Sequence, residues 1–312
     1  MLKFFIHRLL AMIPVILGVI FIVFTIMSLT PGTPGSTILG IMASQDEIDA
    51  LNRQLGYDRP FLERFVRYAS GAVRGDFGNS YLTGEPVFNR IFSRLPITAL
   101  LATLVVITAV MIGVPLGILS AVRRYSALDL ISTVSAMFLA AVPEFWLGIL
   151  LILLFALRLS WLPTFGVDSL RSFILPTLAM SLPAAAAILR LTRATMLETI
   201  RQDYIRTARA KGAPERNVIW KHALRNALIP VITMVGAFFG ALFGGTILTE
   251  TVFTMPGLGL LTLDAIRMND TPQVMASVIF LSMIFCVIML IVDIALAFID
   301  PRAGIRQMGA RE

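Results

Sequence analysis

Few side chains in this sequence are of the types that carry out chemistry. The single cysteine, Cys286, cannot form an internal disulfide, and two histidines, His7 and His222, are too few to build a zinc site by themselves. The sequence contains neither the G-x4-G-K-[ST] loop that cradles ATP phosphates nor an H-E-x-x-H or G-x-S-G motif. We therefore expect no catalytic residue, no metal site and no cofactor bound by this chain, which is predicted not to be an enzyme.

The most unusual charged residue is Glu144, the only one in the apolar run from 130 to 157. A run of this length could cross a membrane, and a carboxylate inside it is costly unless it faces a cavity or a partner. Two roles stay open. Glu144, with the adjacent Pro143, lines a path for a solute that carries a cationic group, or it pairs within the helix bundle with Arg190 or Arg193.

A basic segment from 192 to 225 contains a helix-breaking sequence, Lys-Gly-Ala-Pro, near its centre. Gly212 can adopt the positive φ that ends a helix, and Pro214 followed by Glu215 favours the start of the next one. The pattern predicts two short helices at an angle, the first over about 202–211. This segment either lies on anionic lipid or contacts another protein. The side chains that we expect to face outward are Tyr204, Ile205, Ala208 and Arg209.

The composition is typical of a membrane protein. Of the 312 residues, 57% are hydrophobic and only 14% are charged, whereas soluble domains have roughly 45–50% and about 25%. A bilayer core of about 30 Å needs about 20 apolar helical residues, and several runs approach that length. We therefore predict an all-α integral membrane protein with six transmembrane helices. Their expected ranges are 9–30, 95–122, 130–157, 172–193, 226–249 and 271–299.

The positions of the basic residues predict the orientation of these spans. The short segments 158–171 and 250–270 hold few lysines or arginines, and we place them outside. Both termini are expected to be cytoplasmic. The basic excess is explained by this orientation, so we predict contact with membrane lipid and none with nucleic acid. The segments predicted to be cytoplasmic are 1–8, 123–129, 194–225 and 300–312.

The segment from 31 to 94, also predicted to be external, is long enough to fold. Ser44 and Glu47 fit a capping box, and Gly56 stands where a helix C-terminus is expected. A second, amphipathic helix is predicted to begin near Pro60. We expect a helical cap that packs on the outer mouth of the bundle, offers a surface to an external partner, or does both.

The external segment from 250 to 270 contains the glycine-rich string MPGLG. Gly257 and Gly259 are predicted to permit a tight re-entrant loop that lines a cavity. Glu250 and Asp264 flank this turn on its two sides. We therefore expect this loop at the outer mouth of the bundle.

Several strings resemble one protein family along nearly the whole chain. The string YIRTARAKGAPERNVIWKHALRNALIPV, from 204 to 231, is similar to the signature of ABC importer permeases in its A-x3-G core, Ala208 to Gly212. Arg206 and Thr207 replace the acidic residue and the alanine of the general motif. In these replacements, the sequence is similar to dipeptide and oligopeptide permeases of the B type. Together with the following strings, it resembles the peptide/nickel family: LGYDRP (55–60), GDFGNS (75–80), WLPTFG (161–166), ETVFTMPGLG (250–259) and IDPR (299–302).

This resemblance implies the type I ABC importer permease fold in a bacterial inner membrane. It also implies that the chain forms half of a translocation path, with a second, different permease subunit as its partner. Two ATPase subunits would bind ATP and Mg, and an external solute-binding protein would deliver the solute. The implied solute is a dipeptide or oligopeptide, with a nickel complex or glutathione as alternatives within the family.

A transporter of a different class, a secondary transporter driven by an ion gradient, is the alternative to the ABC importer permease. The sequence of such a transporter would be expected to contain inverted repeats and paired intramembrane carboxylates. By inspection, the first three and last three predicted spans show no such likeness, and only Glu144 lies deep in a span.

The resemblance also assigns roles to individual residues. The region 202–214 corresponds to the coupling helix that docks on an ATPase, and the loop 250–270 corresponds to an outer gate. The expected coupling residues are Tyr204, Arg206, Thr207, Ala208, Lys211, Gly212, Pro214 and Glu215. The expected gate residues are Glu250, Pro256, Gly257 and Gly259.

Overall fold

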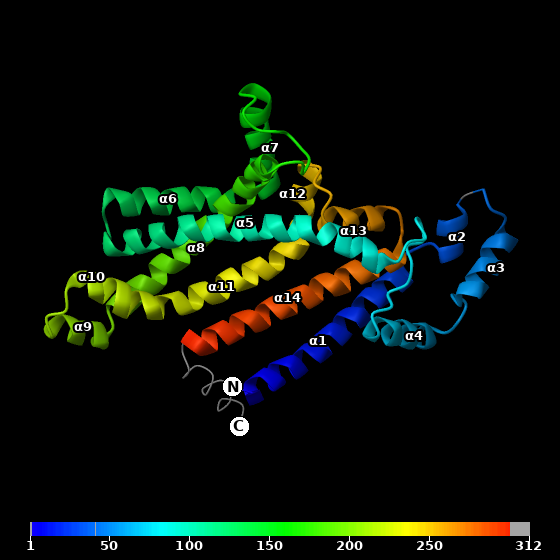
Figure 1. Ribbon diagram of the computed structural model, residues 1–312, viewed down its shortest axis with the longest axis horizontal. Coiled ribbons are helices and arrows are strands. Elements are labelled where there is room, and N and C mark those ends of the chain that lie inside the picture. The colour runs from blue at the N-terminus through cyan, green and yellow to red at the C-terminus, as the bar shows by residue number, and fades with distance from the viewer. Residues whose placement is uncertain (1, 41, 300–312) are drawn as a thin grey trace. The chain divides into compact units, whose positions relative to one another are not determined.

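The structure is a computed structural model that describes residues 2–40 and 42–299, and it is almost entirely helical (Figure 1). Within these ranges there is no β-strand, and the only β-type pairing is an isolated bridge between Asn79 and Pro86. The predicted all-α fold is therefore confirmed. The predicted tail 300–312 and the end of the IDPR string lie outside the described residues.

Among the described residues, five helices are long and apolar enough to cross a membrane. A sixth candidate is a pair of helices bent by 100°, α6 (Ala127–Ala141) and α7 (Glu144–Leu151), the second of which continues into the π-helical segment η1 (Ile152–Arg158). The five single helices are α1 (Leu2–Leu29), α5 (Val87–Val122), α8 (Ile174–Ile200), α11 (Leu224–Gly245) and α14 (Thr271–Ile299).

The bend between α6 and α7 lies at Val142 and Pro143. Val142 has extended backbone angles, φ −84° and ψ 125°, and Pro143 follows with φ −63° and ψ 135°. A proline disfavours the helical region for the residue before it, so α6 ends there. The apolar run predicted as one span over 130–157 is thus two helices with a break between them.

Three short helices follow α1, namely α2 (Pro34–Leu39), α3 (Gln45–Leu55) and α4 (Phe61–Val73). Ser44 and Glu47 form the predicted capping box, because the Ser44 hydroxyl accepts from the Glu47 amide and the Glu47 carboxylate accepts from the Ser44 amide at 2.9 Å. Gly56 ends α3 in the left-handed region with φ 71°. These predictions of helix boundaries are confirmed.

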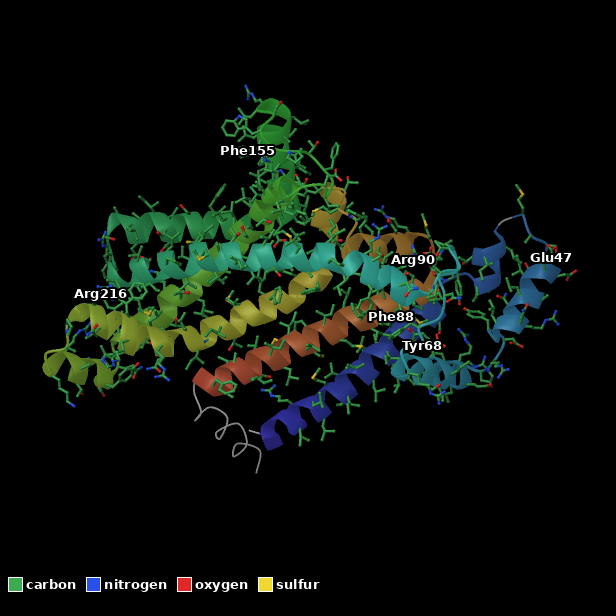
Figure 2. The ribbon with its side chains drawn as sticks, in the orientation of Figure 1. Glu47, Tyr68, Phe88, Arg90, Phe155 and Arg216 are labelled. Carbon is green, nitrogen blue, oxygen red and sulfur yellow. The ribbon has the colours of Figure 1, made fainter. Side chains whose placement is uncertain are left out.

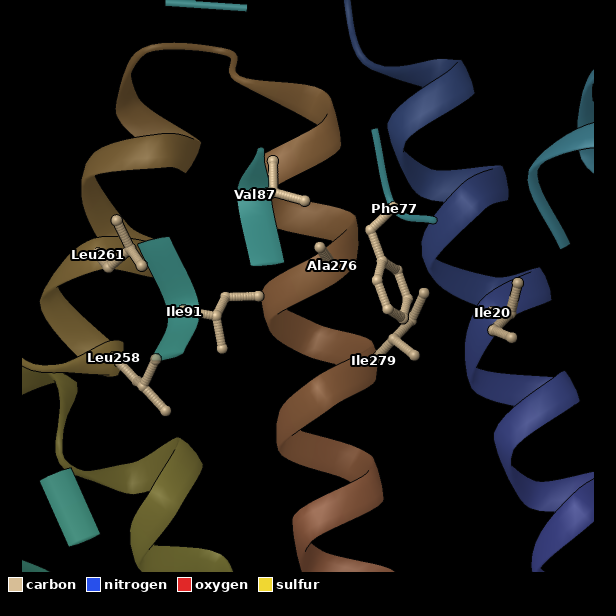
Figure 3. Close-up of a cluster of buried hydrophobic side chains, with 8 residues drawn as sticks. All are labelled: Ile20, Phe77, Val87, Ile91, Leu258, Leu261, Ala276 and Ile279. Atoms are coloured by element: carbon tan, nitrogen blue, oxygen red, sulfur yellow. The ribbon is translucent and has the colours of Figure 1, made fainter. Parts of the chain in front are cut away.

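The chain divides into two compact units, which we describe separately. Unit 1 comprises Met1–Thr98, Phe243–Ile247 and Pro256–Val287, and it includes α13 (Leu258–Arg267). Its α4 packs on α1 through aromatic rings, with the Phe24 ring centroid 5.3 Å from that of Phe61 and 5.6 Å from that of Phe65. Its buried core cluster, shown in Figure 3, consists of Ile20, Phe77, Val87, Ile91, Leu258, Leu261, Ala276 and Ile279.

Unit 2 comprises Ala99–Leu242, Leu248–Met255 and the residues from Ile288 onward. Helices α6 and α7 pack on α8, and α5 approaches α8 closely at Gly113. A Cβ atom at that glycine would lie 2.7 Å from the carbonyl oxygen of Ala185, too close for any larger residue. Its shorter elements are η2 (Leu170–Phe173), α9 (Asp203–Ala210), α10 (Glu215–Asn217), η3 (Val218–Ala223) and most of α12 (Ile247–Val252).

Candidate functional site

The predicted break after α8 is a turn between the short helix α9 and α10, and we call residues 203–217 the elbow. Because α10 continues through η3 into α11 as one helix of 31 residues, the second helix is not the separate short helix that was predicted. Helix α9 ends at Ala210, and Gly212 adopts φ +79°. The Gly212 amide donates to the carbonyl of Arg209 at 2.9 Å, and Pro214 is the N-cap of α10. The predicted helix end at Gly212 and the predicted start at Pro214 are both confirmed, because each depends on local backbone preferences.

One residue of the elbow was placed wrongly by the sequence. Ile205, expected to face outward, is fully buried. It belongs to an apolar cluster in which residues from the C-terminal parts of α5 and α8 and from the start of α11 meet. The physical reason is that Ile205 is the one large aliphatic side chain of α9, so burying it is the strongest apolar contact that this short helix can make. The other buried members are Ile118, Ala121, Met196, Val218, Ala223 and Ala227.

The opposite face of the elbow is exposed and basic. Tyr204 is 43% exposed, and its hydroxyl accepts a hydrogen bond from Asn226 Nδ2 at 2.8 Å. Across the turn, the Arg209 guanidinium donates to both carboxylate oxygens of Glu215, at 2.6 and 3.1 Å, and this raises the pKa of Arg209 above its ordinary value. Among the predicted coupling residues, Ala208 is half-buried, and the others are exposed: Tyr204, Arg206, Thr207, Lys211, Gly212, Pro214 and Glu215.

A buried ion pair near the elbow was not predicted. Asp129, in the first turn of α6, accepts from Arg193 Nε at 2.6 Å and from Nη2 at 2.9 Å. It also accepts from the Tyr125 amide at 3.0 Å and from the Ser120 hydroxyl, and its side chain is only 6% exposed. Ser126, three residues earlier, caps α6. That Ser-x-x-Asp spacing is the one sequence signal that could have indicated the position of Asp129.

The partners suggested for Glu144 are wrong. Arg193 pairs with Asp129 instead, and Arg190 is exposed. Glu144 is half-buried at the first position of α7, where the helix dipole favours a carboxylate. In the part of the chain that the structure describes, its side chain forms no ion pair or hydrogen bond. Pro143 is exposed at the bend.

The predicted gate loop consists largely of two short helices, α12 and α13. Glu250 is fully buried in α12, and its backbone carbonyl accepts from the Met255 amide at 2.8 Å. The turn after α12 uses Thr254, with φ 49°. Gly257 has φ −95° and is the N-cap of α13, and Gly259 lies inside that helix. The expectation that these two glycines make the tight turn is therefore wrong, and Pro256 precedes a regular helix.

Comparisons with known proteins agree with this architecture. The family described as "Binding-protein-dependent transport system inner membrane component" matches residues 113–305, and the one described as "Binding-prot-dependent transport system membrane comp, N-term" matches residues 1–102. Two curated relatives are the glutathione transport system permease proteins GsiC of Escherichia coli strain K12 and of Shigella dysenteriae serotype 1. Each is 42% identical over 301 residues, which cover 96% of this chain and 98% of the relative.

A solved structure is also similar. A chain of the MetNI methionine ABC transporter, in a crystal form with inward-facing conformations, matches with a TM-score of 0.57 and 21% identity. The match covers 69% of this chain and 98% of that chain. At 21% identity, it is evidence of a similar fold only. The family matches extend over most of the sequence, and the relatives are similar over nearly all of it. This chain therefore belongs to the binding-protein-dependent transport system inner membrane components, as a permease subunit, not an enzyme, of an ABC importer of the peptide/nickel group.

Proposed function

We propose that this permease forms half of the path for glutathione or another small peptide. The observation that supports this solute class is the 42% identity, over nearly the whole chain, to permeases named for glutathione transport. Glutathione is itself a small peptide, so a dipeptide or oligopeptide stays within the same class. A nickel complex is the alternative within the family.

The proposed assembly contains this chain, a different second permease, two ATPases and an external solute-binding protein. The ATPases would bind ATP and Mg, because this sequence lacks the loop that holds nucleotide phosphates. We place both termini and the elbow in the cytoplasm, and residues 31–94 and 250–270 outside. The distribution of basic residues supports this orientation.

In this proposal, the elbow couples ATP hydrolysis to transport. The burial of Ile205 supports this role, because it fixes α9 to the ends of three long helices while leaving the basic face free. An ATPase docked on Tyr204, Arg206, Thr207 and Lys211 would therefore move those helix ends when it closes. Gly212, Pro214 and Glu215 would hold the angle of the turn, and Ala208 would allow close approach.

We place Glu144 and Pro143 on the translocation path. The 100° bend and the unpaired state of the Glu144 carboxylate within the described residues support this assignment. The segment with Glu250, Pro256, Gly257 and Gly259 would be the outer gate. Its two short helices, α12 and α13, are elements that could shift as units.

The test is ATPase activity of the complex purified through a tag on this chain and placed in lipid nanodiscs. Each candidate solute-binding protein is added with glutathione, a dipeptide or a nickel complex in separate samples. We expect ATPases to co-purify, and their rate to rise with one binding protein loaded with glutathione or a peptide. Stimulation by nickel alone would contradict the solute class. Uptake in proteoliposomes driven by an ion gradient, without ATPases, would contradict the proposed assembly.

A further inference from the structure

A cavity of about 340 Å³ lies within unit 1, between the end of α1, the loops around α3 and α4, and the start of α14. This volume is within the range of small-molecule sites, about 300–1,000 Å³. The elbow and the bend contribute no residue to it, and the gate loop 250–270 contributes only Asn269. No predicted coupling, path or gate residue lines the cavity.

Part of the cavity lining is apolar. Phe24 and Met27 come from the last turns of α1, Phe77 from the loop after α4, and Met275 from the first turns of α14. Both α1 and α14 are candidate spans, so the cavity lies where two spans end. An apolar group would be favourably buried on these side chains.

Arg64 provides a positive charge at the cavity that no carboxylate of the described residues neutralises by an ion pair. Its guanidinium lies over the Tyr57 ring, 3.9 Å from the centroid, and is half-buried. Its one hydrogen bond is a long one, 3.4 Å from Nη1 to the carbonyl of Tyr57. A guanidinium has five N–H donors, so most of them remain for a ligand.

Tyr68 provides a second unused polar group. It projects from α4 (Figure 2) and lines the same cavity. Its hydroxyl is buried and has no hydrogen-bond partner within the described part of the chain. Leaving such a group unpaired is unfavourable, and native proteins rarely tolerate this without a reason. A bound acceptor would remove the cost.

The charges around the cavity favour an anion. Two guanidiniums, those of Arg64 and Arg67, line it with one carboxylate, Asp76. The Asp76 carboxylate already accepts from the Gly78 amide at 3.0 Å, and Arg67 has a distant contact with Glu63 at 3.7 Å. Arg64 is thus the charged side chain of the cavity that is most available to bind an anion. Arginine donors suit the oxygens of a carboxylate or phosphate.

We propose that this cavity binds an amphiphilic anion, with its carboxylate or phosphate on Arg64 and the Tyr68 hydroxyl and its apolar part on Phe24, Phe77 and Met275. Two sources share this chemistry. One is a soluble carboxylate with an apolar side chain, and the other is the headgroup region of an anionic phospholipid. The inference goes beyond the proposed transport function and does not depend on the identity of the transported solute.

Binding is measured on the full-length chain with two probes. The soluble probe is radiolabelled N-acetyl-phenylalanine, measured by equilibrium dialysis in nanodiscs of phosphatidylcholine, with N-acetyl-phenylalaninamide as the uncharged comparison. The lipid probe is phosphatidylglycerol, measured by native mass spectrometry against phosphatidylcholine. We expect saturable binding of at least one anionic probe. The acid alone would assign a soluble ligand, and phosphatidylglycerol alone would assign a lipid.

Three variants locate the binding. Arg64→Gln should weaken it about 10- to 100-fold, because it removes a charge-assisted hydrogen bond. Tyr68→Phe should weaken it about fivefold without lowering the melting temperature, since it removes only a hydroxyl that is unpaired in the free protein. Arg53→Gln, an exposed position on α3 outside the cavity, should bind as the wild type does.

The proposal is overturned if neither anionic probe binds saturably. It is also overturned if the amide binds as tightly as the acid while phosphatidylcholine binds as tightly as phosphatidylglycerol. Equal binding by wild type, Arg64→Gln and Tyr68→Phe would contradict it as well. The melting temperature of Arg64→Gln shows whether its loss of binding comes from misfolding, and Tyr68→Phe tests the site independently of that charge.

Discussion

Short helices build both the elbow (203–217) and the cap segment (31–94), but different contacts hold them. The elbow is anchored by one apolar side chain, Ile205, in a closed cluster. In the cap segment, α2 and α3 are joined by the buried amide of Asn52. Its Oδ1 accepts from the Gly35 amide at 2.8 Å, and its Nδ2 donates to the Thr33 hydroxyl at 3.1 Å.

These different contacts suit the elbow to transmit displacement between helices and the cap segment to bind a ligand or partner. Interiors packed with apolar side chains are close-packed and pass displacements on, so the elbow is suited to move with α5, α8 and α11. The cap segment lines a cavity with Arg64, which forms no ion pair within the described residues, and with Tyr68, whose hydroxyl has no hydrogen-bond partner there. It is suited to recognise a ligand or a partner.

The largest loss of stability is expected for Asp129→Asn, near the helices to which the elbow is anchored. It breaks the buried pair that fixes α6 to α8, and removal of one partner from a buried pair costs about 3–5 kcal/mol. The measurement is the free energy of unfolding in mixed micelles. Asp203→Asn is the control, because the Asp203–Arg206 pair is exposed and its atoms are 3.6 Å apart. Equal stability of the two variants would contradict our account of the pair.

Ile205→Ala should release the elbow. It leaves a cavity in a closed cluster, at a cost of about 2–5 kcal/mol. We expect faster hydrogen exchange over residues 203–217, measured by mass spectrometry, with the long helices unchanged. Leu62→Ala is the control, because Leu62 on α4 is 69% exposed, and it should leave hydrogen exchange unchanged in every segment. Unchanged protection of the elbow in Ile205→Ala would show that its anchor lies elsewhere.

Asn52→Ala should loosen the cap segment alone. It leaves the buried Gly35 amide without its acceptor, at a cost of about 1–3 kcal/mol. Exchange should rise in α2 and at the start of α3 while the elbow keeps its protection. Gln54→Ala, on the exposed side of α3, is the matched control. A rise in both segments would break the distinction that we draw between them.

The smallest effect is a pH dependence in the loop after α4. Burial raises the pKa of Tyr81 to about 12, and the negative charge of Asp270 adds to this. Below pH 10 the phenol is neutral in both the folded and unfolded states, so its contribution to stability is fully present. Between pH 10 and 12 the unfolded state loses the proton first, and stability should fall by at most roughly 1.4 kcal/mol per pH unit.

Urea unfolding at pH 9, 10 and 11 measures this slope, and Tyr81→Phe should reduce it. Burial also raises the pKa of Tyr68, so the double variant with Tyr68→Phe should be flatter still. An unchanged slope in the double variant would mean that other groups control the loss of stability.

Local features could be predicted from the sequence. The capping box at Ser44, the stop at Gly56, the break at Gly212 and the start at Pro214 each depend on a few neighbouring residues. Backbone preferences of glycine and proline and the reach of a capping side chain decide them. The resemblance of the elbow sequence to ABC permeases also follows from contiguous residues.

Features that depend on distant residues could not be predicted. Asp129 and Arg193 are far apart in sequence, and the periodicity of one helix does not indicate which arginine reaches which carboxylate. The burial of Ile205 depends on helix ends contributed by α5, α8 and α11. Gly257 and Gly259 allow a turn without requiring one, and Thr254 makes it instead.

The coupling role of the elbow can be tested by measuring whether ATPase subunits protect it from chemical labelling. Thr207 is exposed on α9, and the chain has one cysteine, Cys286. In a Cys286→Ser background, Thr207→Cys is labelled with a maleimide in the isolated permease and in the complex with its ATPases. Asp46→Cys, on an exposed position of α3, is the control. We predict that assembly slows labelling at position 207 at least about tenfold and leaves position 46 unchanged, whereas equal labelling of position 207 in both samples would contradict the coupling role of the elbow.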